Sequence, residues 1–441
     1  MPRKKEEVSD FRYDTGQARV PWDAVGEHVR AADILALIEF LLRPAQGRAK
    51  AYDARLKRLA AELRKLAEVG VPAGKLSLAG NVQALEEQAA KLLRVKHAVF
   101  LTNATAGFEI GMKYAGLQPG DEVIAPAITF IATIAYPLAM GAKVVLADVD
   151  PRSLNMDPKD VERKITPKTQ VIIPVHIGGY PVDMAPIMSL ARKHRITVIE
   201  DAAHAFGGSY KGKMTGAIGH FGSFSFHEVK NVTALGEGGI LVSNMPFGKE
   251  LRRARFLGLD LTRQIPNWLY DVPAFKGKEG YFFTGNYSTT EVQALGLLTQ
   301  MKRLKRIIAK RKRAAQYLNK RFAKEDGVIT PPGDDDKVKS TYHLYLLQIE
   351  PDKVGGDIKT LKKKLDARGI VQIPHFAPLY KFSVMKQLGY DTKAIEATCP
   401  VAEEAFQHRF THLPLYDFDQ ERLKCLADAV IDAVREMKRG E

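Results

Sequence analysis

The pattern of apolar and polar positions divides this chain of 441 residues into three parts. Residues 1–74 show the three- and four-residue spacing of apolar side chains that is typical of helices. Residues 75–300 alternate short apolar runs with helical patterns, and residues 301–441 mix helical and strand-like segments. Because this length exceeds what one hydrophobic core usually serves, we expect a helical N-terminal extension, a large α/β domain and a smaller C-terminal α+β domain.

The middle part contains apolar runs that have the length of buried strands. Helical patterns or turns separate them, and this alternation predicts a doubly wound, largely parallel sheet. The runs cover residues 98–101, 122–125, 143–147, 170–174, 197–200, 221–226 and 239–242.

The two outer parts are mainly helical. Helices are expected at 31–42 and 49–69 before the sheet, and a final amphipathic helix at about 419–438, with a strand-like run at 342–349. Residues 302–324 carry eleven of the cations and no acid, interleaved with apolar residues at near-helical spacing. This pattern predicts one amphipathic helix with a solvated basic face, although docking of an acidic ligand or surface stays open as the alternative.

Composition narrows the class of protein. The hydrophobic fraction of 45% and the charged fraction of 27% are ordinary for a globular chain. No apolar run reaches the length of about 18–20 residues that spans a bilayer, and the N-terminus lacks the apolar core of a signal peptide. Two cysteines cannot form a disulfide framework, so we expect a cytoplasmic protein with no membrane partner. The net charge of +15 invites nucleic-acid binding, but we expect none, because much of that charge belongs to the basic helix.

Three polar residues follow predicted strands. Asp201 closes the run 196–200, Ser225 lies at the end of the next run, and Lys230 follows five residues later, before Gly-Glu-Gly-Gly. Because ligands of open α/β sheets sit beyond the carboxyl ends of the strands, these groups converge on one crevice. Pyridoxal phosphate (PLP) requires such a set: a lysine for its Schiff base, an acid for its pyridine nitrogen and donors for its phosphate.

At these residues the chain resembles the DegT/StrS sugar aminotransferases, a group of fold-type-I PLP enzymes. The shared motifs are Asp-Ala-Ala-His from Asp201, Ser-Phe-His-x-x-Lys-Asn from Ser225, and Gly-Glu-Gly-Gly from Gly236. The resemblance covers roughly residues 75 to 435. It implies a large domain with a seven-stranded type of sheet, a smaller C-terminal domain, PLP as cofactor and no metal. One residue more than the family's commoner spacing separates Lys230 from Gly236, which we interpret as a loop variation.

The resemblance implies that Lys230 and Asp201 are the catalytic residues. Lys230 would hold PLP covalently and, once displaced by the amino donor, move the proton between substrate and cofactor. Asp201 would keep the pyridine nitrogen protonated. From the residues alone, Lys230 could be a solvated surface group, and Asp201 could cap a helix beginning at Ala202.

Further cofactor contacts follow from the same resemblance. His204 stands where many relatives have a glutamine beside the phenolic oxygen of PLP, and Ser225 where they have a phosphate ligand. Thr105 and the Ala106 amide occupy the family's phosphate-binding helix start, and the ring of Phe130 would stack on the pyridine ring. The residues alone also allow a plain N-cap role for Thr105, a structural role for His204 and a core position for Phe130.

Asn286 matches a family asparagine that reaches the cofactor phosphate across a dimer interface, which implies a homodimer with a shared active site. Ser288 replaces the arginine of that motif. On the substrate side, Tyr380 stands where the family usually has histidine. His343 and His375 could contact the substrate, or they could be structural.

The sequence thus predicts a PLP-dependent aminotransferase that acts on a keto-sugar, with glutamate or glutamine as amino donor. The substrate would be a nucleotide-linked sugar, a keto-cyclitol or a keto-sugar acid used in cell-surface polysaccharide or secondary-metabolite biosynthesis. One alternative is a PLP-dependent sugar dehydratase, against which Lys230 argues because histidine replaces the lysine in that branch. The other is a non-catalytic regulatory protein with the same fold.

Overall fold

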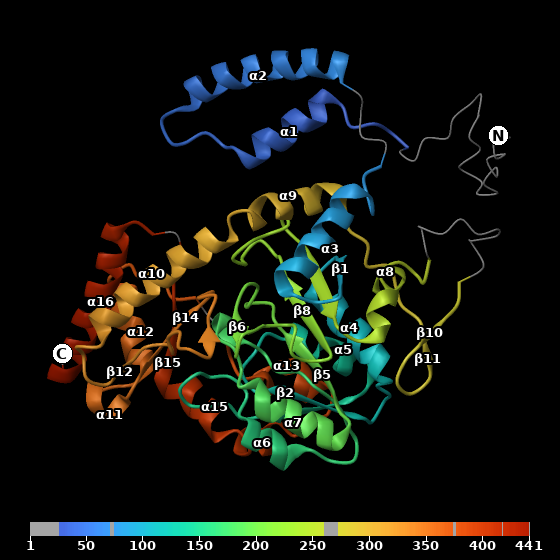
Figure 1. Ribbon diagram of the computed structural model, residues 1–441. Helices are drawn as coiled ribbons and strands as arrows, with labels where there is room; N and C mark the ends of the chain where they lie inside the picture. Colours follow the sequence, from blue (N-terminus) through green and yellow to red (C-terminus); the bar gives the residue numbers. More distant parts are fainter. Residues whose placement is uncertain (1–25, 71–74, 260–271, 374–375, 417, 441) are drawn as a thin grey trace.

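The computed structural model describes residues 26–70, 75–259, 272–373, 376–416 and 418–440. Its central sheet (Figure 1) consists of β1 (His97–Leu101), β2 (Glu122–Pro126), β3 (Lys143–Ala147), β4 (Thr169–Ile172), β5 (Thr197–Asp201), β8 (Phe221–Ser225) and β9 (Gly239–Ser243). The strand order is β1-β9-β8-β5-β4-β2-β3, and neighbouring strands are parallel except where β9 pairs with β1 and β8. The predicted α/β fold is confirmed, and each predicted run forms one strand of this sheet.

Helices cover both faces of the central sheet, as the alternation of the sequence predicts. They are α3 (Gly80–Leu93), α4 (Ala104–Ala115), α5 (Ala132–Met140), α6 (Pro158–Lys164), α7 (Met184–His194), α8 (Leu251–Ala254) and α9 (Glu291–Met301). Leu101 and Leu241 share one buried cluster with α4, whereas Phe100 and Ile240 share another with α3 and α9. Since adjacent strand residues point to opposite faces, these helices lie on opposite sides of the sheet.

The C-terminal part contains a three-stranded antiparallel sheet in the order β12-β14-β15. Its elements are β12 (Val328–Ile329), β14 (Tyr345–Ile349), β15 (Phe410–Leu413), α10 (Leu304–Phe322), α11 (Pro351–Val354), α12 (Ile358–Ala367) and α16 (Gln420–Arg439). Phe322 of α10, Leu347 of β14 and Val430 of α16 belong to one buried cluster. The division of the chain at residue 300 stays a prediction, because segments from beyond it also pack on the central sheet.

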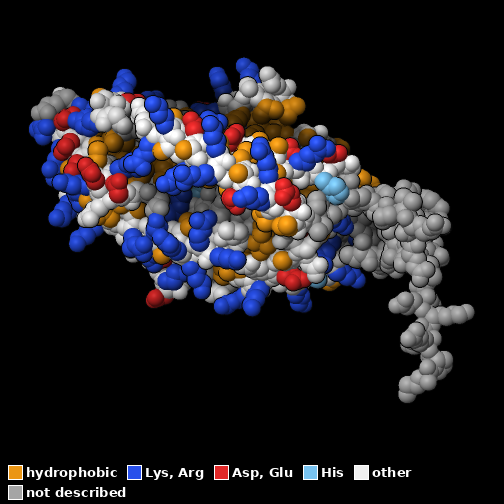
Figure 2. Space-filling model, turned by 90° about the horizontal axis from the view of Figure 1, so that it is seen from above, with side chains coloured by type: hydrophobic (Ala, Val, Ile, Leu, Met, Phe, Trp, Pro, Cys, Tyr) orange, Lys and Arg blue, Asp and Glu red, His pale blue; other side chains and the backbone are white. Residues whose placement is uncertain are grey.

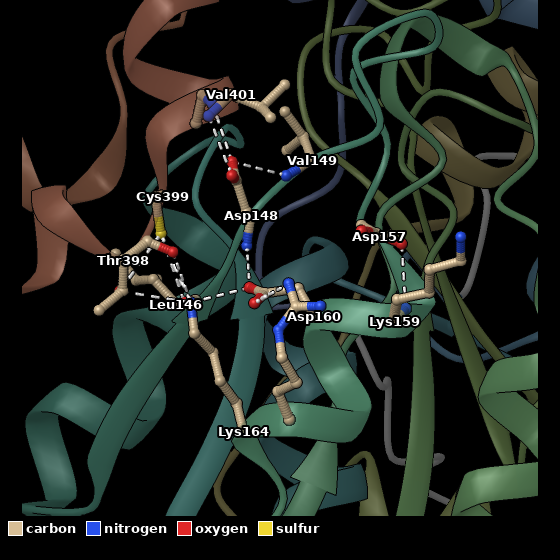
Figure 3. Close-up of polar contacts among 12 residues, drawn as sticks. Leu146, Asp148, Val149, Asp157, Lys159, Asp160, Lys164, Thr398, Cys399 and Val401 are labelled. Carbon is tan, nitrogen blue, oxygen red and sulfur yellow. Dashed lines mark hydrogen bonds and ion pairs between the residues drawn. The ribbon is translucent and has the colours of Figure 1, made fainter.

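One such segment contains α13 (Ser383–Gln387), α14 (Thr392–Ala397) and α15 (Pro400–Glu404). The carboxylate of Asp148, which follows β3, accepts a hydrogen bond from the Val401 amide at 2.9 Å (Figure 3). Asp160 accepts from the Asp148 amide at 2.6 Å and pairs with Lys164 at 2.8 Å. Lys164 Nζ also donates to the Leu146 carbonyl at 2.6 Å. These contacts attach α15 to the edge strand of the sheet.

The short elements complete the fold. A second three-stranded sheet joins β13 (Val338–Lys339) to β6 (Ser209–Tyr210) and β7 (Lys213–Met214), and β10 (Phe275–Lys276) pairs with β11 (Tyr281–Phe282). The single-turn helical segments are η1 (Ile177–Gly179), η2 (Pro246–Glu250), η3 (Leu379–Lys381) and η4 (Ala405–Arg409). No helix in the described ranges is long and apolar enough to cross a membrane.

Two predicted helices form a separate layer above α9 (Figure 1), namely α1 (Ala31–Leu41) and α2 (Ala49–Val69). Neither contains a buried residue. The basic helix α10 buries Leu304, Leu318 and Phe322 and exposes cations such as Arg306, Arg313 and Lys320, which confirms its amphipathic character. Seen from above, Lys and Arg side chains cover much of the molecule, with apolar side chains between them (Figure 2).

Candidate active site

The predicted site residues gather at one edge of the central sheet. Asp201 ends β5 and Ser225 ends β8, Lys230 lies in the connection from β8 to β9, Thr105 follows β1, and Phe130 follows β2. The strands β1, β2, β5 and β8 run in the same direction, since β9 is antiparallel to both β1 and β8. Their carboxyl ends therefore meet at the edge where open α/β sheets bind ligands.

Asp201 is buried, and its carboxylate accepts two hydrogen bonds. The Thr133 hydroxyl donates to Oδ2 at 2.8 Å and the Ala203 amide to Oδ1 at 3.1 Å. Burial raises the pKa of Asp201 above its usual value, although these bonds and the charge of Lys230 act in the opposite direction. No helix lies between β5 and β6, so the alternative role of Asp201 as a helix cap is wrong.

Lys230 is partly buried in a loop held by its own backbone. Its amide donates to the His227 carbonyl at 3.0 Å, and the Glu228 amide donates to the Gly236 carbonyl at 2.8 Å. Burial lowers the pKa of Lys230 to about 8, against the charges of Asp201 and Glu237, which raise it. Lys230 is therefore no ordinary solvated lysine, and a substantial fraction of its amine is neutral near neutral pH.

The start of α4 is a candidate anion site because the first amides of a helix lack intrahelical partners. Asn103 is its N-cap and accepts from the Ala106 amide at 2.9 Å, so the N-cap role considered for Thr105 is wrong. This hydrogen bond already uses the Ala106 amide, which was predicted to bind the phosphate. A phosphate at this amide would therefore compete with the Asn103 side chain. Thr105 lies in the first turn and is partly exposed.

Ser225 and His204 both precede Lys230 in the sequence, by 5 and 26 residues. The Ser225 hydroxyl accepts from the His227 amide at 3.3 Å and is partly exposed at the end of β8. The ring of His204 lies 4.5 Å from that of His343, whose Nδ1 is 3.0 Å from Asn231 Oδ1. Asn231 directly follows Lys230, so the two histidines are connected to the lysine loop. His375 lies outside the described residues.

Two predicted residues are exposed. Phe130 has 60% of its surface accessible, so the alternative that it is a core residue is wrong. Asn286 is also exposed, and its Oδ1 accepts from the Ser288 amide at 3.0 Å. The neighbouring Tyr287 carbonyl accepts from the Thr102 amide at 3.1 Å, which brings Asn286 close to the start of α4.

Other positions do not join this group. Tyr380 is buried and donates to Glu403 at 2.7 Å, and burial raises its pKa. A cavity of about 670 Å³ lies beside the edge strand β3, lined among others by Val145 and Tyr390, and none of its lining residues is a predicted site residue. No cluster of three or more metal-ligating side chains occurs in the part of the chain that the structure describes.

The sequence did not indicate two buried polar residues near this site: Thr133, which donates to Asp201, and Glu200, which precedes Asp201 in β5. The spacing of Thr133 from Thr129 could have indicated it, because residues four apart lie on one side of a helical turn. Glu200 was noted only as a strand residue, although a buried acid needs partners and therefore indicates a polar network.

The chain is similar over most of its length to known proteins of one family. Residues 58–433 match the model of the DegT/DnrJ/EryC1/StrS aminotransferase family. The spore coat polysaccharide biosynthesis protein SpsC of Bacillus subtilis is 34% identical over 391 residues, which cover 86% of this chain and 95% of that protein. The GDP-perosamine synthase of Caulobacter vibrioides is 33% identical over 342 residues, which cover 76% of this chain and 86% of that protein.

Solved structures show the same fold. Spr1654 of Streptococcus pneumoniae in its PLP form superposes with a TM-score of 0.73 at 26% identity, covering 83% of this chain and 94% of that chain. DesV of S. venezuelae gives a TM-score of 0.69 at 28% identity, with 88% and 96% covered. The predicted fold-type-I architecture is confirmed by these similarities.

Proposed function

The chain belongs to the DegT/DnrJ/EryC1/StrS aminotransferase family, and from this premise we propose that it transfers an amino group to a keto-sugar. It is a PLP-dependent aminotransferase. We infer a substrate used in polysaccharide biosynthesis from the names of two relatives, a spore coat polysaccharide biosynthesis protein and a perosamine synthase. Glutamate or glutamine is the proposed amino donor.

The pair of Lys230 and Asp201 is the observation that supports this proposal most strongly. A lysine with a pKa of about 8 is neutral in roughly a quarter of molecules at pH 7.5, and only a neutral amine can attack an aldehyde. The buried carboxylate of Asp201 is near enough for its charge to act on Lys230. A lysine nucleophile and a buried acid beyond the carboxyl ends of neighbouring strands are the two groups that PLP requires.

The remaining residues fit the same cofactor. When bound, PLP supplies an electron sink that allows a proton to leave the α-carbon of an amino acid. Lys230 binds it covalently and moves that proton, and Asp201 holds negative charge against the ring nitrogen. Ser225 and Thr105 donate to the phosphate at the α4 N-terminus, and Phe130 packs on the ring.

His204 is the proposed donor to the phenolic oxygen, and the neighbouring His343 is a proposed contact for a hydroxylated substrate. Asn286 is proposed to reach the phosphate of a second subunit, so the enzyme would be a homodimer with shared active sites. Its exposure, together with that of Phe130, supports a partner surface at this edge.

A first half-reaction assay tests the proposal. Protein loaded with PLP is freed of excess cofactor and mixed with glutamate, and 2-oxoglutarate is measured. We expect about one equivalent per active site from the wild type and from the surface control Lys249→Ala, and none from Lys230→Ala. A panel of keto-sugars then identifies the acceptor by the return of the PLP absorbance. Equal yields of 2-oxoglutarate from the wild type and Lys230→Ala would refute the assignment.

A further inference from the structure

The side chain of Asp201 is held by a segment that lies 68 residues earlier in the chain. Thr133 Oγ1 donates to Asp201 Oδ2 at 2.8 Å, and Thr129 Oγ1 lies 3.0 Å from Thr133 Oγ1. Thr129 is 3% exposed and Thr133 is fully buried, so water does not compete for these bonds. Thr133 lies in the first turn of α5 and Thr129 lies between β2 and α5, beyond the carboxyl end of β2.

The chemistry of these groups fixes the direction of the hydrogen bonds. A carboxylate accepts only, so the single hydroxyl proton of Thr133 is directed to Asp201. The contact between the two hydroxyls then requires Thr129 to donate to Thr133. The result is a chain from Thr129 through Thr133 to Asp201, in which each bond polarises the next.

The same turn carries Phe130. The Thr133 amide donates to the Phe130 carbonyl at 3.1 Å, so the exposed ring and the buried hydroxyl belong to one hydrogen-bonded turn. A displacement of this turn would therefore move both the aromatic surface and the donor to Asp201.

We propose that Thr133 is a positioning residue for the transamination, whose hydroxyl keeps the Asp201 carboxylate ionised and oriented toward the ring nitrogen of PLP. Thr129 strengthens that hydrogen bond. The inference rests on the proposed role of Asp201 in the function above, and it adds the residues through which the chain stabilises that role.

The energetics follow from burial. Desolvation raises the pKa of Asp201, and the hydrogen bonds from Thr133 and Ala203 and the charge of Lys230 oppose it. The bond from Thr133 is the largest of these opposing influences. Without this hydrogen bond a larger fraction of Asp201 is protonated, and a protonated carboxyl does not stabilise a protonated ring nitrogen.

The test compares Thr133→Val, which removes the donor and keeps the shape, with Thr133→Ser, which keeps the donor. Thr129→Val removes only the polarising hydroxyl. Thr411→Val is the matched control, because Thr411 is equally buried and its hydroxyl has no hydrogen-bond partner among the described residues. Three quantities are measured: the PLP dissociation constant, the pH midpoint of the bound cofactor's absorbance change, and the melting temperature of the apo-protein.

We expect Thr133→Val to weaken PLP binding about tenfold and to raise the pH midpoint by about half a unit, because a ring nitrogen without its proton repels the proton on the nitrogen that joins PLP to Lys230 less strongly, so the pKa of that nitrogen rises. Thr133→Ser should bind PLP within about twofold of the wild type. Thr129→Val should weaken PLP binding about threefold and shift the pH midpoint in the same direction as Thr133→Val, but by less. Thr411→Val should change neither.

The inference is overturned if Thr133→Val keeps the PLP affinity and pH midpoint of the wild type and only its melting temperature falls. Thr133 would then have a structural role alone. If Thr133→Val does not fold, Thr129→Val and Thr133→Ser decide: wild-type behaviour of Thr129→Val, or a defect in Thr133→Ser, overturns it. Lys230→Ala separates the two proposals. If Lys230→Ala still shows an absorbance that borohydride removes, the proposed function is refuted. If Lys230→Ala lacks that absorbance while Thr133→Val behaves like the wild type, only this inference is refuted.

Discussion

Glu200 Oε2 lies 2.9 Å from His176 Nε2, and both side chains are fully buried next to Asp201. The Val182 amide donates to Nδ1 of His176 at 3.0 Å, so the ring proton lies on Nε2 and is donated to Glu200. Glu200 also accepts from the amides of the turn 216–219, at 2.8 Å from Gly216 and 2.6 Å from Gly219. One acid thus connects β5 to the turn that leads into β8.

Glu200→Ala should destabilise the fold severely. It leaves three amides and the His176 N–H without an acceptor in the interior, and each buried unsatisfied donor costs about 1–3 kcal/mol. We expect a loss of about 3 kcal/mol or more in the free energy of unfolding, measured with denaturant. Glu228→Ala, in an exposed loop, should change it by less than about 0.5 kcal/mol. Similar values for both variants would contradict this account of the network.

Gly239→Ala should weaken cofactor binding. A Cβ at position 239 would lie 2.2 Å from the carbonyl carbon of Asn103, so the cap of α4 must move. We expect PLP affinity to fall about tenfold in equilibrium dialysis, because the α4 N-terminus is the proposed phosphate site. Gly80→Ala is the control, since a Cβ there meets nothing within 4 Å. Unchanged affinity in Gly239→Ala would place the phosphate elsewhere.

The rate at which PLP attaches to the apo-protein should depend on pH. Below its pKa the Lys230 amine is protonated and cannot react, so the rate should rise with pH through a midpoint of about 8. Asp201→Asn removes a charge that raises the pKa of Lys230, so its midpoint should be lower. Stopped-flow absorbance from pH 6 to about 10.5 measures both midpoints. A midpoint near that of free lysine would show that Lys230 is not desolvated.

Removal of residues 1–70 should leave the remaining fold intact, because neither α1 nor α2 contains a buried residue. The free energy of unfolding should change by less than about 0.5 kcal/mol. Leu85→Ala in α3 is the comparison, because Leu85 is fully buried and its truncation should cost about 2–5 kcal/mol. A loss of that size on deletion would contradict the proposal that residues 1–74 form an extension outside the core.

Much of the fold could be predicted because the central strands are short, continuous apolar runs buried on both faces. The run 143–147 coincides with β3, and α2 has the bounds expected from its periodicity. The antiparallel direction of β9 could not be predicted, because a run such as Gly239–Ser243 has the same apolar pattern in either direction. Two-residue strands such as β6 and β13 are too short to show an alternation of apolar and polar residues, so they could not be predicted.

The candidate site was predictable where a motif joins neighbouring residues, as in Ser225 and Lys230. Contacts between distant segments were not. Thr133 meets Asp201, and Glu200 meets the turn 216–219, only after the sheet has formed. The sequence allowed Thr105 as the N-cap of α4, but the N-cap is Asn103. Helix ends depend on backbone geometry that can be predicted from the sequence only to within a residue or two.

Mass-spectrometric mapping of the borohydride-reduced protein tests the central claim most directly. Purified protein is loaded with PLP, reduced, digested and searched for the lysine that carries the cofactor. The account predicts one modified peptide, which contains Lys230, with loss of the absorbance near ~410–430 nm on reduction. Modification at another lysine, or none after loading with PLP, would contradict the assignment of Lys230 and of the strand-end site around it.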